Sequence, residues 1–434
     1  MSTVSTVLRT RLGDLRSDRM LTNSALLFAT SALMAAGGAL FWMVAARLQS
    51  AEVVGLAGSL VAAADAIALF AQLGLNIALV RTMPSSDRKA ADVLTATAVV
   101  ATTGTVFALA FALLLPVTSP SLHSVVDSPW VVGLFCLLVA GTAVNVLTDN
   151  VFLAIDRVRS YLWLNGILLG AAKCALPFLL VGAGALGLYG SVGGAALLCG
   201  VASLWVVLRH LPRPRGLAPS RELRQARGFA GASHVTYVLT VLPQMVLPLV
   251  VINALGPAAG AFFFVSIQVV TLQNAVLLAV GSSMYAESER HPHRRTGVVA
   301  RGGMTMAVVG ALSALAVVLA APLVLAVFGP EYADQGTATL RVMALGVLGL
   351  GFNYWVAMRL RIAGNATAMV VAQLVCTTLV LGSCIVLAPH GTVWAAAAWG
   401  GAQLVGGLVG LLISVTISPL KDAAPGAEPV GSVR

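Results

Sequence analysis

Long apolar runs alternate along this chain with short segments that hold most of its charged residues. A helix needs about 20 mostly apolar residues to cross a bilayer, and these runs reach that length. They are continuous rather than alternating, which favours helices over the strands of a membrane barrel. The pattern therefore predicts twelve membrane-spanning helices, at residues 21–46, 53–80, 93–116, 130–155, 161–181, 187–208, 230–254, 258–285, 302–327, 338–358, 366–387 and 394–417.

The longest basic segment divides the predicted helices into two groups of six. It contains six arginines and three prolines and follows the sixth span. Because six is even, the two halves would share one orientation in the membrane. The turns after the first and seventh spans both end in glycine, and the fourth and tenth spans both close on Arg-x-Arg. The predicted organisation is a basic amphipathic N-terminus (1–20), an N-lobe (21–208), a linker (209–229), a C-lobe (230–417) and a tail (418–434).

Composition supports lipid as the solvent of most of this chain. Of its 434 residues 59% are hydrophobic and 10% are charged, and the mean hydropathy is +0.94. A typical soluble domain has roughly 25% charged residues, so these values exclude a soluble enzyme and a disordered chain. The five cysteines lie within apolar runs without metal-ligand spacing, which predicts buried thiols rather than a disulfide framework or a metal site.

The net charge of +10 is explained by membrane orientation. With the N-terminus in the cytoplasm, 23 of the 26 Lys and Arg residues fall in cytoplasmic segments and two, Arg47 and Arg341, fall outside. Such a bias is typical of multi-pass proteins of the bacterial plasma membrane. Both termini are therefore predicted to be cytoplasmic. Binding to nucleic acid is not expected, because no soluble region is large enough to read one.

Several short elements resemble a known transporter family. They are ARLQSAEVVG from residue 46, AQLGLNIALVR from 71, FLAIDRVRSY from 152, LGPAAGAF from 255 and FGPEYADQGTATLRVM from 328. Their order is similar to the polysaccharide-export branch of the MOP superfamily, whose members flip lipid-linked oligosaccharides and are relatives of the MATE antiporters. The resemblance covers nearly the whole chain. It implies an all-α polytopic protein with two six-helix lobes around a central cavity, and alternating access for an undecaprenyl-pyrophosphate-linked saccharide.

The sequence does not indicate an enzyme. It lacks the GxSxG, HExxH and Walker patterns, and its outer loops are too short to carry a glycosyltransferase site. No cofactor is expected, although a coupling ion, H⁺ or Na⁺, is left open. The expected partners are the lipid-linked saccharide, membrane lipids and other membrane proteins of a polysaccharide-assembly system.

Lys173 and Asp65 are charged residues within the predicted spans. Each lies about twelve residues into its own span, and the two spans run in opposite directions, so their depths are similar. A charge at mid-span costs on the order of 2.5–3.5 kcal/mol and usually faces protein or water. Lys173 could therefore meet a phosphate or acidic sugar in the cavity, pair with Asp65, or extend toward the lipid interface.

Polar residues also recur at helical spacing on three spans. Cavity-lining faces or hydrogen bonds between helices would both explain such stripes. For the second and seventh spans the cavity is the favoured interpretation, and there the resemblance agrees. The stripes are Asp65, Gln72 and Asn76 on the second span; His234, Tyr237 and Gln244 on the seventh; and Asn145, Asp149 and Asp156 on the fourth.

Three other residues of the predicted spans have candidate roles in transport. Pro243 and Pro248 interrupt the backbone hydrogen bonding of the seventh span, which would suit a gate or a static kink. Arg47 closes the first span at the outer face, where it could attract a pyrophosphate or anchor the helix at lipid headgroups.

Three functions remain open from the sequence. The first is the flipping of a lipid-linked oligosaccharide from the cytoplasmic to the outer leaflet. The second is cation-coupled export of amphipathic drugs, as in MATE transporters. The third is a non-transporting component of a polysaccharide-export assembly.

Overall fold

The computed structural model describes residues 19–212, 216, 218–417 and 420. The predicted N-terminal segment and C-terminal tail lie almost entirely outside these residues. Every regular element of the described chain is helical, which confirms the predicted fold class. The helices are α2 (Arg19–Leu48), α3 (Ala51–Ala71), α4 (Leu75–Thr82), α5 (Lys89–Thr118), α6 (Pro120–His123), α7 (Pro129–Ala154), α8 (Val158–Tyr161), η1 (Leu162–Leu168), α9 (Leu169–Leu180), η2 (Val181–Ala183), α10 (Gly184–His210), α11 (Arg221–Leu255), α12 (Pro257–Arg290), η3 (Pro292–Arg294), α13 (Arg295–Phe328), α14 (Pro330–Ile362), α15 (Ala366–Leu387), η4 (Ala388–His390) and α16 (Thr392–Thr416).

Twelve helical passes arise from eleven long apolar helical stretches of the described chain. One of them, Val158–His210, has 53 residues. As a straight helix it would extend about 80 Å, more than twice the thickness of a hydrocarbon core. It instead reverses at η2 and Gly184, whose φ of 55° lies in the region that favours glycine. The two passes on either side of this turn are α8–η1–α9 and α10.

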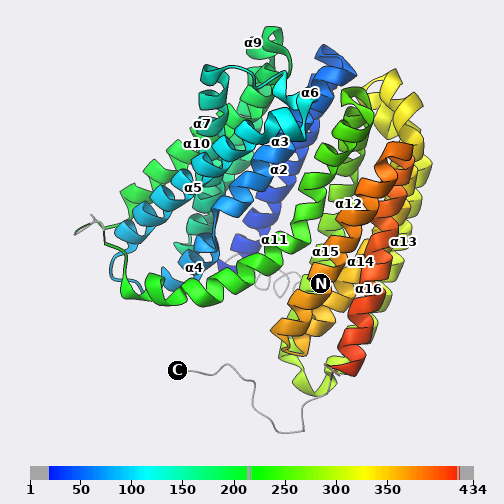
Figure 1. Cartoon of the computed structure of the whole chain (residues 1–434). Coiled ribbons are helices and arrows are strands. Elements are labelled where there is room, and N and C mark those ends of the chain that lie inside the picture. Colours follow the sequence, from blue (N-terminus) through cyan, green and yellow to red (C-terminus); the bar gives the residue numbers. More distant parts are fainter. Residues whose placement is uncertain (1–18, 213–215, 217, 418–419, 421–434) are drawn as a thin grey trace, which may run out of the picture.

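The passes form two bundles, with α2 to α10 on one side and α12 to α16 on the other (Figure 1). One end of the molecule carries the turns after α2, α11 and α13. We call it the outer end, following the predicted charge orientation, and the opposite end the inner end. We refer to these two bundles as the N-lobe and the C-lobe.

The apolar core is shared between the lobes in the outer half and divided in the inner half. One buried cluster contains Phe41 and Val54 of the N-lobe together with Phe263 and Trp399 of the C-lobe. Toward the inner end, one cluster packs N-lobe residues against Leu223 and Ala230 of α11, and another lies within the C-lobe. The two bundles therefore share one core at the outer end, whereas at the inner end the N-lobe packs on α11 and the C-lobe has a cluster of its own.

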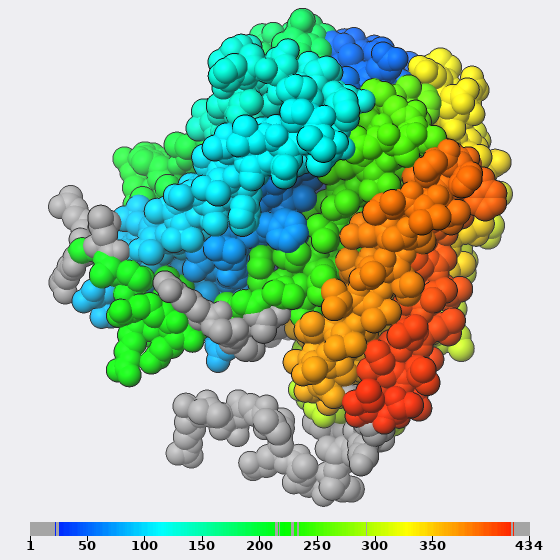
Figure 2. Space-filling view, viewed as in Figure 1, coloured from blue at the N-terminus to red at the C-terminus, as the bar shows by residue number. Residues whose placement is uncertain are grey.

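Helix α11 connects the lobes at the inner end. In Figure 1 it begins beneath α5 and α4, crosses under the N-lobe and then rises along the C-lobe. The space-filling view shows the same green segment running from the underside of the N-lobe to the boundary between the lobes (Figure 2). Because α10 extends to His210 and α11 begins at Arg221, the predicted linker 209–229 is in part helical rather than a solvated loop.

A buried carboxylate fixes the start of α11 to the N-lobe. Asp92 is fully buried on α5 and accepts hydrogen bonds from the Ser220 backbone N–H and the Ser86 hydroxyl, both at 2.6 Å. The Ser220 hydroxyl in turn accepts a hydrogen bond from the Leu223 N–H as the N-cap of α11. This capping explains why the arginine-rich segment becomes helical at this position.

Candidate functional site

Lys173 lies inside the N-lobe between two carboxylates. It is half-buried on α9, within electrostatic range of Asp65 on α3 and Asp149 on α7. No ion pair within 4.0 Å joins its ammonium to either carboxylate in the described part of the chain. Two carboxylates therefore lie within electrostatic range of one ammonium group, without a direct ion pair. We call these three residues the N-lobe triad.

Water can reach the triad. The Asp65 side chain is exposed although many protein atoms lie around it, so its carboxylate is open to water rather than sealed in the packed core. The Asp149 Oδ1 atom is buried, and among the described residues it has no hydrogen-bond partner. A buried acceptor without a partner costs about 1–3 kcal/mol, which favours water or an ion at this position.

A π-helix in the same pass as Lys173 carries a buried amide without a hydrogen-bond partner among the described residues. Asn165 is fully buried in η1, and neither atom of its amide has a partner within the described ranges. The neighbouring Leu164 carbonyl accepts a 3.5 Å contact from the Cys199 thiol, and Cys199 lies within electrostatic range of Lys173 and Asp149. π-helical turns are rare and occur frequently at functional sites. The sequence analysis did not identify Asn165, because one amide within an apolar run carries no periodic signal.

The predicted stripe on the second span does not share one helical face. The helix is broken after α3, where Leu73 and Gly74 have φ values of 46° and 81°. Gln72 is fully buried at this break and donates to the Ala143 carbonyl on α7 at 2.9 Å. Asn76 lies after the break, on α4, and its side-chain Oδ1 has no hydrogen-bond partner among the described residues. Gln72 therefore has a packing role between helices, whereas Asp65 joins the triad.

The break also allows α11 to approach the N-lobe closely. A Cβ atom at Gly74 would lie 2.7 Å from the Ala230 carbonyl oxygen of α11. His234, one turn further along α11, is buried beside the Leu69 backbone. It is thus packed at the inner junction of the lobes rather than lining a wide cavity.

Tyr237 and Gln244 mark two polar regions of the C-lobe surface. Tyr237 is 50% exposed and lies near Tyr354 of α14. Gln244 borders a small pocket, about large enough for one water molecule, together with Thr271 and Asn274 of α12. Asn274 is 4% exposed, and its amide has no partner in the described part of the chain.

Among the described residues, the C-lobe interior contains amides and no carboxylate–lysine group of this kind. Asn353 donates to Gln403 at 2.9 Å, and Cys376 contacts both residues. Neither this cluster nor Asn274 was predicted, because helix-to-helix distances are not encoded in the spacing along one helix. The two lobes thus differ in chemistry, with charged groups in the N-lobe and neutral hydrogen-bonding groups in the C-lobe.

Pro243 frees a backbone carbonyl that binds another helix. Proline has no N–H for the carbonyl four residues earlier, which here belongs to Leu239. The Thr377 hydroxyl of α15 donates to that carbonyl at 2.6 Å, and Gln373 approaches it at 3.4 Å. Pro243 and Pro248 both lie within α11, which remains one helix from Arg221 to Leu255.

Arg47 is hydrogen-bonded to the other lobe. Its Nε and Nη2 atoms donate to the Val327 and Ala326 carbonyls of α13, both at 3.0 Å. In the structure these two donors contact protein carbonyls at the outer end. Among the described residues, no group of three or more His, Cys, Asp or Glu residues is placed to hold a metal ion.

Comparison with known proteins shows the fold. No family model and no curated protein matches this sequence. The inward-facing structure of a multidrug resistance MATE family transporter of the MOP superfamily is similar, with a TM-score of 0.66, 17% identity and coverage of 88% of this chain and 94% of that chain. The outward-facing conformation of a MATE transporter gives a TM-score of 0.59 with 17% identity, covering 92% and 96%.

A third similar structure is a MOP superfamily transporter from Pyrococcus furiosus, described as having reverse polarity of its binding pocket. It gives a TM-score of 0.60 with 15% identity and covers 93% of this chain and 96% of that chain. The chain therefore has the fold of MATE family transporters of the MOP superfamily. At these identities the likeness does not extend to substrate or branch.

Proposed function

We propose that this chain is an alternating-access transporter in the state that opens toward the cytoplasm. The core shared by the two bundles and the cross-lobe hydrogen bonds lie at the outer end, whereas at the inner end the N-lobe packs on α11 and the C-lobe has a cluster of its own. The higher TM-score to the inward-facing MATE structure supports the same assignment. The positive charges at the inner end support cytoplasmic termini in a bacterial plasma membrane.

The substrate that we propose is a lipid-linked oligosaccharide, flipped from the cytoplasmic to the outer leaflet. The observation that carries this proposal is the neutral polar surface of the C-lobe. Tyr237 and Thr271 are exposed there, Gln244 and Asn274 are among the residues that line a small pocket, and exposed apolar residues such as Leu272 lie beside them on α12. Hydroxyl and amide groups beside apolar surface suit a sugar headgroup attached to a hydrocarbon chain. The sequence elements of the polysaccharide-export branch support the same class.

One observation favours a second candidate, a cation-coupled exporter of amphipathic drugs. The N-lobe triad contains two carboxylates and one ammonium group, so its ionised form has a net negative charge. Such a site suits a cationic substrate or a coupling ion, H⁺ or Na⁺, better than it suits a pyrophosphate. Under the first proposal the triad would therefore serve coupling, and Lys173 would not bind the headgroup directly.

A reconstituted transport assay separates the candidates. Proteoliposomes would contain a short-chain polyprenyl-pyrophosphate-linked disaccharide with a fluorescent sugar, and a membrane-impermeant reagent would quench the outer leaflet. We expect protein-dependent loss of protected fluorescence, reduced at least roughly fivefold by Asn274→Leu and retained by the adjacent Gln273→Leu. Gln273 is a matched control because it is equally buried but does not border the pocket.

The same vesicles would be tested for ethidium uptake with an imposed proton or sodium gradient. Ethidium transport without movement of the saccharide would contradict the first proposal and favour the second. Movement of neither probe would favour a non-transporting role within an export assembly, alongside other membrane proteins of that system.

A further inference from the structure

The outer end of α13 presents two backbone carbonyls to the N-lobe. The last four carbonyls of a helix have no N–H partner within it, and they carry the negative end of the helix dipole. In α13 the Gly329 N–H bonds back to Leu325. The next two carbonyls, of Ala326 and Val327, instead accept the guanidinium of Arg47 at 3.0 Å each. A planar donor fork from one lobe therefore caps a helix of the other.

A second set of hydrogen bonds crosses between the lobes at the same end. Asn253 lies near the outer end of α11, and its amide nitrogen donates to the Thr118 carbonyl of α5 at 2.9 Å. Its amide oxygen accepts the Ser119 hydroxyl at 2.5 Å. Ser119 is buried, with 3% of its surface exposed, whereas Asn253 is exposed, so this contact lies at the edge of the packed interface.

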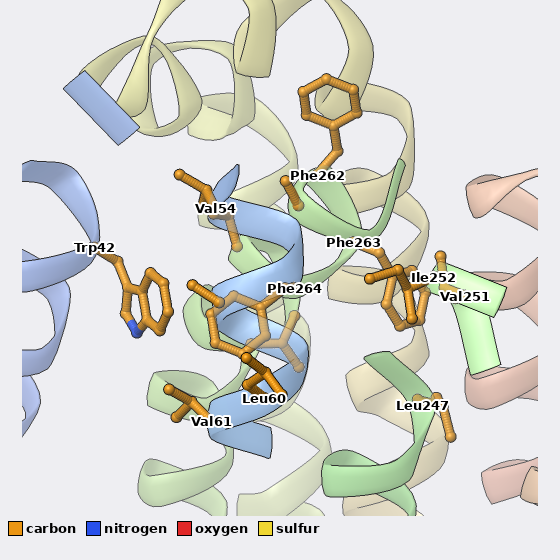
Figure 3. Close-up of a cluster of buried hydrophobic side chains, with 14 of the residues drawn as sticks. Trp42, Val54, Leu60, Val61, Leu247, Val251, Ile252, Phe262, Phe263 and Phe264 are labelled. Atoms are coloured by element: carbon orange, nitrogen blue, oxygen red, sulfur yellow. The ribbon is translucent and has the colours of Figure 1, made fainter. Parts of the chain in front are cut away.

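Between these two points the helices are in direct apolar contact. A Cβ atom at Gly55 would lie 1.9 Å from the Pro257 carbonyl oxygen, so α3 and α12 meet backbone to backbone. Figure 3 shows Phe264 of α12 between Trp42 of α2 and Leu60 and Val61 of α3. The rings of Trp42 and Phe264 are 4.6 Å apart between centroids. The apolar contact buries surface between the lobes but has no fixed direction. The two polar contacts are hydrogen bonds with defined directions and partners.

We infer that Arg47 and Asn253 form a two-point outer latch that holds the lobes in the inward-facing state. The inference rests on the proposed alternating access, because separation of the outer ends must break both contacts. Arg47 is then a positioning residue that sets the balance of conformations. In this state its Nε and Nη2 atoms donate to the other lobe, whereas the roles of headgroup anchor and of pyrophosphate attraction stay predictions from the sequence.

The chain contains a matched control for Arg47. Arg341 is predicted from the sequence to lie on the outer side, and within α14 its Nε donates to the Val318 carbonyl of α13 at 3.1 Å. Arg341 belongs to α14, so this bond remains within the C-lobe. Replacing either arginine removes one positive charge and its hydrogen bonding to α13. Only the replacement of Arg47 removes a contact between the two lobes.

The test is hydrogen–deuterium exchange of the full chain in nanodiscs without substrate. It compares Arg47→Ala, the milder Arg47→Gln, Asn253→Ala and Arg341→Ala with the unaltered protein. For the Arg47 and Asn253 variants we expect faster exchange in outer peptides covering 51–61 and 257–267, and slower exchange in inner peptides covering 221–235. The outward-facing population should rise at least roughly tenfold, as loss of about 1.4 kcal/mol would give. Arg341→Ala should leave both regions unchanged.

The opposite responses of the two ends distinguish a latch from general stabilisation. Faster exchange at both ends of the Arg47 variants would mean that the contact only stabilises the fold, and would overturn the inference. Equal behaviour of the Arg47 and Arg341 variants, or no change in either, would also overturn it. Because no substrate is added, these outcomes are independent of whether the proposed saccharide is transported.

Discussion

The positive charge of Lys173 is balanced by two carboxylates at a distance rather than by one direct ion pair. Asp65 and Asp149 come from different helices, and both lie within electrostatic range of Lys173. Interactions of this kind depend on the positions of three helices, so they connect packing of the N-lobe with the charge state of the triad. Binding or release of an ion or proton at the N-lobe triad would thereby alter the packing of the N-lobe helices without any change in the C-lobe.

A double-mutant cycle tests this compensation. Lys173→Met should lower the thermal midpoint by several degrees, because it leaves two carboxylates without their positive partner. Asp65→Asn should have a smaller effect, and the double variant should recover at least half of the loss, with a coupling energy of about 0.5–3 kcal/mol. Additive effects in thermal unfolding would mean that Lys173 does not compensate Asp65. Lys89→Met, at the inner surface, is the control.

Sequence reasoning predicted part of this site. Equal depth on oppositely directed spans predicted Lys173 and Asp65 to be neighbours, because depth follows from residue counts alone. Asp149 was identified on its own stripe but was not connected to Lys173. Asn165 and Asn274 were missed, since their importance depends on unpartnered amide atoms that become visible only after the helices are packed.

Among the elements, α11 connects the two lobes physically. Asp92 fixes its first turn to the N-lobe, and Thr377 binds the carbonyl released by Pro243 in the C-lobe. The sequence predicted a linker followed by a span, because arginine and proline are frequent in loops. The capping by Ser220 and Asp92 makes these segments one helix of 35 residues. Movement of the lobes must therefore bend or rotate α11.

Replacing both Pro243 and Pro248 by alanine tests whether this helix must bend. The variant restores two backbone donors and should straighten and stiffen α11. We expect transport to fall at least roughly fivefold while the amount of protein in the membrane stays unchanged. Pro322→Ala, within α13 of the C-lobe, is the control. Full transport by the double variant in the proteoliposome assay would show that transport does not require α11 to bend.

At the scale of the whole molecule, the number of passes and the two lobes followed from hydropathy. Backbone groups in lipid must be satisfied within each segment, so a long apolar run leaves few structural alternatives. The break at Gly74 and the π-helix η1 were not predicted, because local departures from α-helix preserve the apolar character of a span. The sequence also did not predict whether the protein is inward- or outward-facing, since this depends on how the two lobes pack against each other.

The central claim is that the lobes exchange between inward- and outward-facing states. Pulsed electron paramagnetic resonance can measure it with spin labels on a background in which the five native cysteines are replaced. The exposed residues Glu52 and Asp334 would report the outer ends, and the exposed residues Asp87 and Ala286 the inner ends. Arg47→Ala, the lipid-linked disaccharide or ethidium would be the perturbations.

The account predicts that the outer distance lengthens as the inner distance shortens, with populations that change together. The starting protein should favour the short outer distance. A single distance at each end, unchanged by Arg47→Ala and by both substrates, would contradict alternating access for this chain.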